Sequence, residues 1–335
     1  MTQSSILITG GAGYIGSHVV KLLGQRKENI IVLDDLSSGF ETSVLYGEFI
    51  KGSTGDQALV DNIIKHNKVE SVLHFAAHTI VPESVENPLK YYKNNTCCTR
   101  NLLECCTAAG IKQFIFSSTA AVYGELKTGF ASEDTPTAPI NPYGSSKLMS
   151  EQMIRDLSQS SSLRHVILRY FNVAGSDPDG LIGQSTRNAT LLIKVAAEVA
   201  LGKREQLKVF GSDYTTPDGT GVRDYIHVTD LASAHVNALD YLRNNGQSTT
   251  LNCGYGHGFS VNDVINAVNK VHGTAINVQT MPRRAGDPAQ LVSVADKIQQ
   301  TLGWRPQYDD LEFIVKTSLA WEKKLSEIKA AEQTL

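Results

Sequence analysis

The chain has 335 residues, of which 41% are hydrophobic and 19% are charged, and its formal net charge is -3. This size and balance are typical of a globular protein with one large α/β domain or two unequal ones. Lysine and arginine form no block, and no long apolar run or basic leader occurs. We therefore expect no nucleic-acid partner, no membrane span and no secretory signal.

A glycine-rich turn follows the first predicted strand. The apolar residues 6–8 form this strand, and a helical pattern begins near residue 19. The turn between them fits both G-x-G-x-x-G and G-x-x-G-x-x-G, with glycines at Gly10, Gly11, Gly13 and Gly16. Such glycines let the backbone approach a pyrophosphate, whose charge the helix N-terminus stabilises. A plain strand-to-helix turn does not need three of them, so the pattern predicts a dinucleotide site.

The second predicted strand, residues 30–33, ends in Asp34 and Asp35. An acid roughly 20 residues beyond the glycine loop is placed to accept hydrogen bonds from the adenosine ribose. It would repel a 2'-phosphate, and no arginine follows within the next several residues, so NAD is favoured over NADP. The simpler interpretation is a polar cap on a strand end.

Two further apolar strands, residues 71–77 and 114–119, are separated by helical stretches. Apolar strands that alternate with helices predict a doubly wound parallel sheet, a Rossmann fold, which binds ligands at the carboxyl ends of its strands. Ala76, Ala77 and the hydroxyl residues Ser117, Ser118 and Thr119 would share that rim with the glycine loop.

Tyr143 and Lys147 have the i, i+4 spacing that places two side chains on one face of a helix. A neighbouring ammonium and a nicotinamide cation would lower the tyrosine pKa from about 10 toward the range of a general base. Ser118 or Thr119 could share a proton with a substrate hydroxyl while Tyr143 removes it. Without such chemistry, Tyr143 and Lys147 would be surface residues of a helix and the hydroxyls would cap a loop.

Another strand, residues 165–171, leads into a loop at 176–187 that is rich in Gly, Asp, Pro and Ser. We take this loop as a domain boundary. A dinucleotide-binding domain would comprise residues 1–175 plus about 224–252, and a smaller α/β domain for the substrate 176–223 plus about 253–335. In the second part we expect helices at about 188–201, 261–272 and 311–332, and strands near 207–210, from 249 and at 276–280.

Arg223 and Arg284 lie in polar stretches of the second part. Both guanidinium groups could converge on a diphosphate. Alternatively each is a surface arginine paired with a nearby acid, Arg223 with Asp224 and Arg284 with Asp287. The sequence leaves the two possibilities open.

The five cysteines occur as two adjacent pairs and one single residue, Cys97-Cys98, Cys105-Cys106 and Cys253. This is neither a disulfide framework nor the spacing of metal ligands. We expect reduced thiols, a cytoplasmic protein and no metal site.

These motifs resemble the extended short-chain dehydrogenase/reductase superfamily and, within it, the UDP-glucose 4-epimerases, also called UDP-galactose 4-epimerases. The resemblance runs from Ile6 to about Leu319. The glycine loop and Tyr-x-x-x-Lys specify only the superfamily, whereas the stretches 170–172 and 219–228 are more particular to the epimerases.

The resemblance implies reversible epimerisation of UDP-glucose and UDP-galactose at C4, by transient oxidation to a 4-keto sugar with tightly held NAD. Tyr143 would be the base, Lys147 would bind the nicotinamide ribose, and Thr119 would hydrogen-bond the reacting oxygen. The residues implied around NAD are Gly10, Gly11, Gly13, Tyr14, Ile15, Gly16, Asp34, Asp35, Leu36, Ser37, Ser38, Gly39, Ser53, Thr54, Phe75, Ala76, Ala77, Asn94, Thr119, Tyr143, Lys147 and Phe171. Those implied around the UDP-sugar are Ser118, Thr119, Tyr143, Asn172, Lys208, Val209, Phe210, Arg223, Arg284 and Asp287.

Four positions depart from the family pattern. Ser53 replaces an Asp near adenine, Thr79 a Lys near the nicotinamide, and Leu191 an Asn or His at the nucleotide-sugar. Leu291 stands where a bulky Tyr or a small Cys or Ser is usual beside the sugar 2-substituent. Its intermediate size leaves acceptance of N-acetylated UDP-sugars open.

Other functions fit less well. A nucleotide-sugar 4,6-dehydratase would carry Asp-Glu after the active-site threonine, but Ala120 and Ala121 follow Thr119. A non-catalytic NAD-binding sensor would be expected to have lost Tyr143 or Lys147. The resemblance also implies a homodimer, through helices near 91–109 and 143–159.

Overall fold

The computed structural model describes residues 4–186, 189–284 and 286–332, with side chains up to residue 328. A seven-stranded parallel sheet forms its larger part, in the order β12-β7-β5-β4-β1-β2-β3. Its strands are β1 (Ser5–Thr9), β2 (Asn29–Asp34), β3 (Glu48–Lys51), β4 (Val69–His74), β5 (Gln113–Ser117), β7 (Arg164–Tyr170) and β12 (Thr249–Cys253). The predicted doubly wound fold is confirmed.

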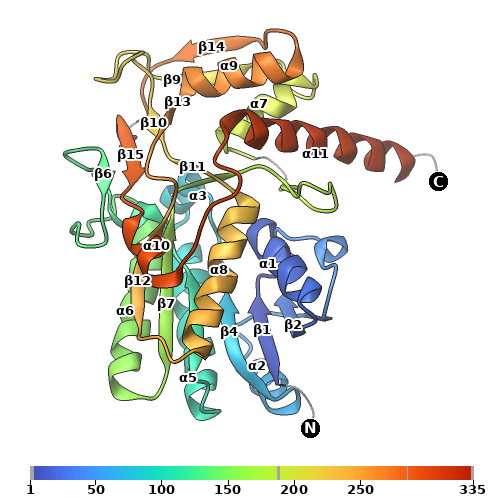
Figure 1. Ribbon diagram of the computed structural model, residues 1–335, viewed down its shortest axis with the longest axis vertical. Helices are drawn as coiled ribbons and strands as arrows, with labels where there is room; N and C mark the ends of the chain where they lie inside the picture. The colour runs from blue at the N-terminus through green and yellow to red at the C-terminus, as the bar shows by residue number, and fades with distance from the viewer. Residues whose placement is uncertain (1–3, 187–188, 285, 333–335) are drawn as a thin grey trace.

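Helices cover both faces of this sheet (Figure 1). Helices α1 (Tyr14–Gln25) and α8 (Val228–Arg243) pack together on one face. Helices α2 (Gln57–His66), α5 (Cys98–Ala108) and α6 (Pro142–Ser160) cover the other face. The apolar run in β1 is buried on both faces of the sheet. Ile6 and Ile8 belong to the hydrophobic core on one face, and Leu7 belongs to the core on the other face.

A smaller unit lies beyond the carboxyl ends of the strands, at the top of Figure 1. Its core is formed by α7 (Leu192–Ala200), β9 (Leu207–Phe210), α9 (Val261–His272) and α11 (Leu311–Glu332), with β14 (Val278–Met281) paired to β9. Helix α9 has a clear start and stop, since Ser260 and Asp263 form a capping box and Gly273 ends it at φ 87°.

Short strands join the two units. A four-stranded sheet has the order β13-β10-β15-β6, and β8 pairs with β11. The strands are β6 (Phe130–Ala131), β8 (Asn172–Ala174), β10 (Val222–Arg223), β11 (Tyr225–His227), β13 (Phe259–Ser260) and β15 (Gln290–Ser293). The remaining elements are η1 (Glu41–Ser43), α3 (Val81–Glu86), α4 (Pro88–Tyr91), η2 (Tyr92–Cys97), η3 (Ala120–Val122) and α10 (Asp296–Leu302).

Most predicted elements are found, with small shifts at their ends. The helix expected at about 188–201 begins at Leu192, and its expected first residue, 188, lies outside the described part of the chain. Helix α10 packs on β12 and α8, and the Trp304 indole donates to the Asp230 carbonyl oxygen at 3.1 Å. This segment therefore packs with the sheet domain, whereas the boundaries predicted from the sequence place it in the second domain.

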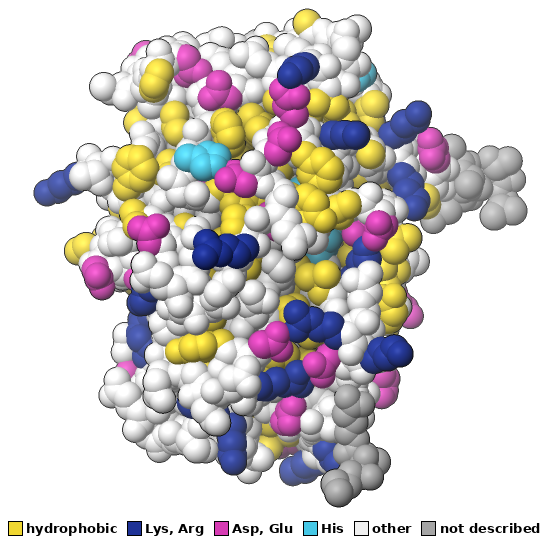
Figure 2. All heavy atoms as spheres, in the orientation of Figure 1, with side chains coloured by type: hydrophobic (Ala, Val, Ile, Leu, Met, Phe, Trp, Pro, Cys, Tyr) yellow, Lys and Arg dark blue, Asp and Glu magenta, His cyan; other side chains and the backbone are white. Residues whose placement is uncertain are grey.

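The surface carries no dominant sign of charge on the face seen in Figure 2, where acidic and basic side chains are interspersed. None of the described helices is sufficiently long and apolar to cross a membrane.

Candidate active site

The glycine loop between β1 and α1 is packed too closely for side chains at two positions. A Cβ on Gly10, which has φ +72°, would lie 2.5 Å from the backbone nitrogen of Ala76, and one on Gly16 would lie 2.3 Å from the Gly10 carbonyl oxygen. Helix α1 has no side-chain cap and no acidic residue in its first turn. Its N-terminal amides are therefore free of competing carboxylates and fit the pyrophosphate of a dinucleotide.

Asp34 ends β2 beside this loop, and its carboxylate accepts from the backbone N–H groups of Ala12 (3.0 Å) and Leu36 (2.8 Å). Burial raises its pKa, and these two donors act in the opposite direction. Each oxygen has a lone pair left for another donor. The side chain thus fits the ribose hydroxyls of a dinucleotide. Leu36 holds a left-handed backbone conformation, φ 61°, in the turn that follows.

Tyr143 lies in the first turn of α6. Pro142 is the first residue of the helix, and the side chain of the N-cap residue Asn141 accepts from the Gly144 N–H at 2.8 Å. Together they fix the start of the helix. Tyr143 is buried, and the side chain of Thr119 acts to lower the pKa of its hydroxyl. Tyr91 packs against the Tyr143 ring edge-on, with 6.5 Å between ring centroids.

Lys147 lies one turn further along α6, and its ammonium nitrogen is 4.1 Å from the centroid of the Phe116 ring. Burial lowers the pKa of Lys147 to about 7, against an opposing effect of Glu151. Burial also raises the pKa of Tyr143, while the side chain of Thr119 lowers it. From the sequence, Lys147 and a nicotinamide cation are together expected to lower the pKa of Tyr143 toward neutral pH. In the protein chain, burial outweighs the opposing effect of Thr119, so positive charge from the nicotinamide has to supply most of the lowering.

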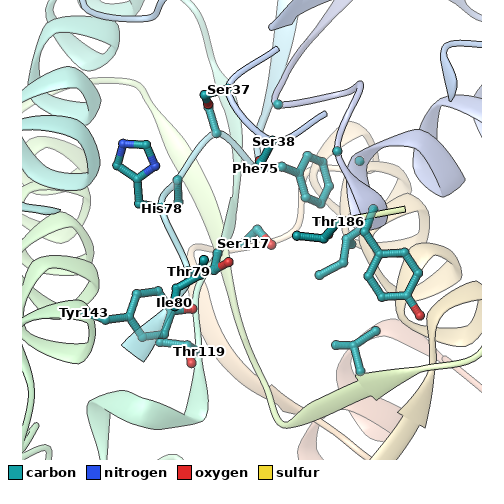
Figure 3. Close-up of a pocket in the computed structure, with 18 of the residues that line it drawn as sticks. Ser37, Ser38, Phe75, His78, Thr79, Ile80, Ser117, Thr119, Tyr143 and Thr186 are labelled. Carbon is teal, nitrogen blue, oxygen red and sulfur yellow. The ribbon is translucent and has the colours of Figure 1, made fainter. Parts of the chain in front are cut away.

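A cavity of about 430 Å³ connects these groups. Figure 3 shows Tyr143 beside Thr119 at one side of this cavity, and Ser37 and Ser38 at another. The predicted site residues that line it are Gly10, Gly13, Tyr14, Ile15, Gly16, Asp34, Asp35, Ser37, Ser38, Ser53, Thr54, Phe75, Ala76, Ala77, Asn94, Thr119, Tyr143, Phe171 and Asn172. All four positions that depart from the family pattern also line this cavity: Ser53, Thr79, Leu191 and Leu291.

Several predicted residues are not part of the cavity wall: Gly11, Leu36, Gly39, Lys147, Ser118, Lys208, Val209, Phe210, Arg223, Arg284 and Asp287. Two of these are turned away by local packing. The Ser118 hydroxyl donates to the buried Glu151 at 2.5 Å, and Val209 lies in the core of the smaller unit. For both, a side-chain contact with substrate does not agree with the geometry.

Arg223 and Arg284 form neither of the pairs considered from the sequence. Arg223 donates to the Asp287 carboxylate at 2.5 Å, and Arg284 lies over the Phe210 ring with 3.7 Å to the centroid. Asp224 instead accepts from the Ser293 hydroxyl at 2.6 Å and from three backbone amides. Since Arg223 is in register with Leu291, this arginine lies directly beside the cavity wall.

Two segments of the chain contribute cavity residues that the sequence did not predict. One segment follows β4 and contributes His78 and Ile80 from a loop and Val81 and Glu83 from the start of α3. The other is the crossing loop, the stretch between β8 and α7, which contributes Gln184, Thr186, Ala189 and Thr190. No motif marks either group. The first segment could have been inferred from its position after β4, since it continues along the rim of the sheet.

The π-helical turn η2 contains two adjacent asparagines whose side chains have different surroundings. Asn94 lines the cavity, whereas Asn95 is buried and bonds both the N–H and the carbonyl oxygen of His78, at 2.8 and 3.0 Å. Asn95 also donates to the Ser146 hydroxyl on α6 at 3.0 Å. The widened turn therefore connects the loop after β4 with the helix that carries Tyr143.

Comparison with known proteins agrees with this site. Residues 6–254 match the NAD dependent epimerase/dehydratase family. A UDP-glucose 4-epimerase of Azospirillum brasilense is 50% identical over 323 residues, which are 96% of this chain and 93% of that relative. The crystal structure of a UDP-glucose 4-epimerase from Brucella ovis in complex with NAD has a TM-score of 0.92 and 41% identity, and covers 94% of this chain and 97% of its own.

A third relative is the UDP-Glc/GlcNAc 4-epimerase from Campylobacter jejuni, with a TM-score of 0.85 and 51% identity over 96% of this chain and 99% of its own. The family resemblance seen in the sequence is thus confirmed. The chain belongs to the NAD dependent epimerase/dehydratase family and, within it, to the UDP-glucose 4-epimerases, which are isomerases.

Proposed function

We propose that this protein interconverts UDP-glucose and UDP-galactose by epimerisation at C4 of the sugar. The supporting observation is that one cavity is lined by the buried Tyr143, with Thr119 beside it, together with Asp34 and the N-terminus of α1. This arrangement combines a general base with the requirements of a dinucleotide site.

NAD fits the chain's own groups. The amides at the start of α1 would hold the pyrophosphate, Asp34 the adenosine ribose, and Lys147 the nicotinamide ribose. When bound, NAD would supply a hydride acceptor for C4 of the sugar and, once reduced, the hydride donor for the opposite face of the 4-keto sugar. For Lys147 to reach the ribose, its ammonium has to move from its position over Phe116 toward the cavity.

Tyr143 moves the proton. Its phenolate oxygen takes the proton of the sugar 4-hydroxyl during oxidation and returns it during reduction, while Thr119 hydrogen-bonds the reacting oxygen. Positive charge close to the ring is required, because burial by itself favours the neutral phenol.

The UDP part would lie toward the smaller unit. Arg223 is beside Leu291 on the cavity wall, and Arg284 lies over Phe210. Guanidinium groups are suited to a diphosphate, and Asp287 would hold Arg223 in place. We further infer that Asn172, Lys208 and the backbone near Val209 contact the nucleotide.

The test of this function is incubation of the purified protein with UDP-galactose without added NAD, followed by chromatographic separation of the products. Conversion to UDP-glucose is expected, because tightly held NAD is regenerated in each turnover. Absence of conversion even after NAD is added, in a protein that binds NAD, would contradict the proposal.

A second activity, on N-acetylated UDP-sugars, has one specific observation in its favour. Leu291 lines the cavity and packs against the cluster formed by Ala120, Val122, Tyr123, Ala131 and Phe171. Its side chain is intermediate in size between those of Tyr and Ser. The Campylobacter jejuni relative is named for both UDP-Glc and UDP-GlcNAc. UDP-N-acetylglucosamine in the same assay distinguishes a dual-specificity enzyme from one restricted to plain sugars.

We also infer a homodimer and a cytoplasmic location. All five cysteines are free thiols, as expected in a reducing compartment.

Near the helices considered for dimerisation, Val85, Leu89 and Met149 are exposed apolar side chains. Apolar side chains that gather on an exposed surface are typical of a subunit interface.

Met149→Glu is therefore expected to shift the protein from dimer to monomer, because it places a charge in an apolar contact. Light scattering coupled to size exclusion gives the mass of each variant. Leu181→Glu is a matched control, since Leu181 is 49% exposed and Met149 48%, but Leu181 lies in the crossing loop. Equal masses for both variants would argue against the α6 interface.

A further inference from the structure

Glu151 is a completely buried carboxylate on α6 that the proposed mechanism does not use. It follows Lys147 by four residues and Tyr143 by eight, so all three side chains project from the same face of the helix. Replacing a buried ion pair by apolar residues is often neutral or stabilising, so stability alone is a weak reason for such a group.

Its carboxylate joins three elements of the sheet domain. Arg169 on β7 donates to both oxygens, at 3.0 Å from Nε and 2.6 Å from Nη2, and Arg155 on α6 donates at 3.0 Å. The Ser118 hydroxyl at the end of β5 donates at 2.5 Å. Ser118 stands between Ser117 and Thr119, which both line the cavity, so this bond fixes the strand end that presents Thr119 to Tyr143.

Glu151 supplies negative charge to a cluster of positively charged side chains. Arg169 and Arg155 bring two positive charges to this one carboxylate, and Lys147 adds a third when it is protonated. The other titratable groups that face it contribute none: burial lowers the pKa of His165 on β7 to about 4 and raises that of Tyr123. Tyr123 accepts from Arg169 at 3.1 Å and donates to Asn252 at 2.6 Å.

We propose that Glu151 is a positioning residue for the epimerase reaction, which holds the Ser118–Thr119 strand end against α6 and places a negative charge one helical turn from Lys147. This inference rests on the proposed function. Its physical basis is the geometry of the Glu151 carboxylate, which accepts from Ser118 and Arg169 and lies one helical turn from Lys147. Burial of Lys147 favours its neutral amine, and Glu151 opposes this effect.

Glu151→Gln keeps the shape of the side chain and removes its charge. Removal of a nearby opposite charge typically moves a pKa by about one to three units. We expect the alkaline limb of the pH profile of kcat/KM, where Lys147 loses its proton, to move to lower pH by about one unit. The acid limb, set by Tyr143 two turns away, moves less, so the profile becomes narrower.

A merely structural role would lower kcat at every pH without changing the limbs, and that result would overturn the inference. Glu151→Asp restores the charge but shortens the reach to Ser118, so it is expected to keep the wild-type limbs with a reduced kcat. Asp156→Asn removes the same charge from the exposed side of α6 and is expected to leave the profile unchanged.

A second measurement does not depend on turnover. In protein labelled with 13C at the lysine ε-carbon, the Lys147 signal, assigned by its loss in Lys147→Arg, is expected to titrate at lower pH in Glu151→Gln. An unchanged Lys147 titration would contradict the inference. If Glu151→Gln does not fold, Arg155→Gln tests the same charge balance with the opposite sign and raises the alkaline limb. An inactive wild type with the expected Lys147 titration would contradict the proposed function instead.

Discussion

Tyr143→Phe is expected to lower kcat for epimerisation by about 10²- to 10⁴-fold, which is the usual contribution of a positioned general base. The change removes only the hydroxyl that takes the sugar proton. The phenylalanine ring keeps the edge-on contact with Tyr91, so the fold and the cavity wall are retained. KM for UDP-galactose should change little, because the lost interaction acts mainly in the transition state.

The measurement is steady-state conversion of UDP-galactose, with bound NAD quantified by absorbance after denaturation. Tyr241→Phe is a suitable control, because the Tyr241 hydroxyl accepts from the Gln247 N–H near the end of α8, outside the cavity wall. A Tyr143→Phe variant that retains NAD and the wild-type kcat would place the base elsewhere, and Thr119 would be the next candidate.

The sequence was sufficient for the larger unit because its signals are local. Continuous apolar runs predict buried parallel strands, and the glycines of the first turn mark a close backbone approach that the structure contains at Gly10 and Gly16. The C-terminal helices could also be predicted from local signals. Helix α9 begins after the capping box at Ser260 and ends before Gly273, at the predicted residues.

Alternation along extended chain explains why Ser118 and Arg223 contact other partners than those considered from the sequence. Successive side chains point to opposite sides, so Ser117 and Thr119 line the cavity while Ser118 faces Glu151. In the same way Arg223 reaches Asp287, and its neighbour Asp224 bonds Ser293. Proximity in sequence suggested an Arg223–Asp224 pair, but neighbouring residues of a strand cannot face one another.

Other features depend on contacts that no local pattern records. Strand β6 has two residues and pairs with β15 from the other end of the chain, so neither segment shows a recognisable strand period. The π-helical turn that turns Asn94 toward the cavity is likewise determined by tertiary packing.

Gly10→Ala is expected to destabilise the protein by about 3 kcal/mol or more, a value reserved for substitutions with a specific structural cause. Two costs add at this position. The backbone has φ +72°, which disfavours any Cβ by about 1 kcal/mol, and the new methyl would lie 2.5 Å from the backbone nitrogen of Ala76. Backbone of the central strands β1 and β4 cannot shift away without loss of sheet hydrogen bonds.

Gly110→Ala separates these two costs. Gly110 follows α5 with nearly the same backbone angle, φ +70°, but an added Cβ there meets no atom within 4 Å. Its cost should therefore be about 1 kcal/mol, from backbone strain alone. Urea unfolding of both variants at equal m-value gives the comparison. If the two substitutions cost the same, the close approach of the glycine loop to the chain after β4 contributes nothing to stability, and the tight packing inferred for the dinucleotide cradle is wrong.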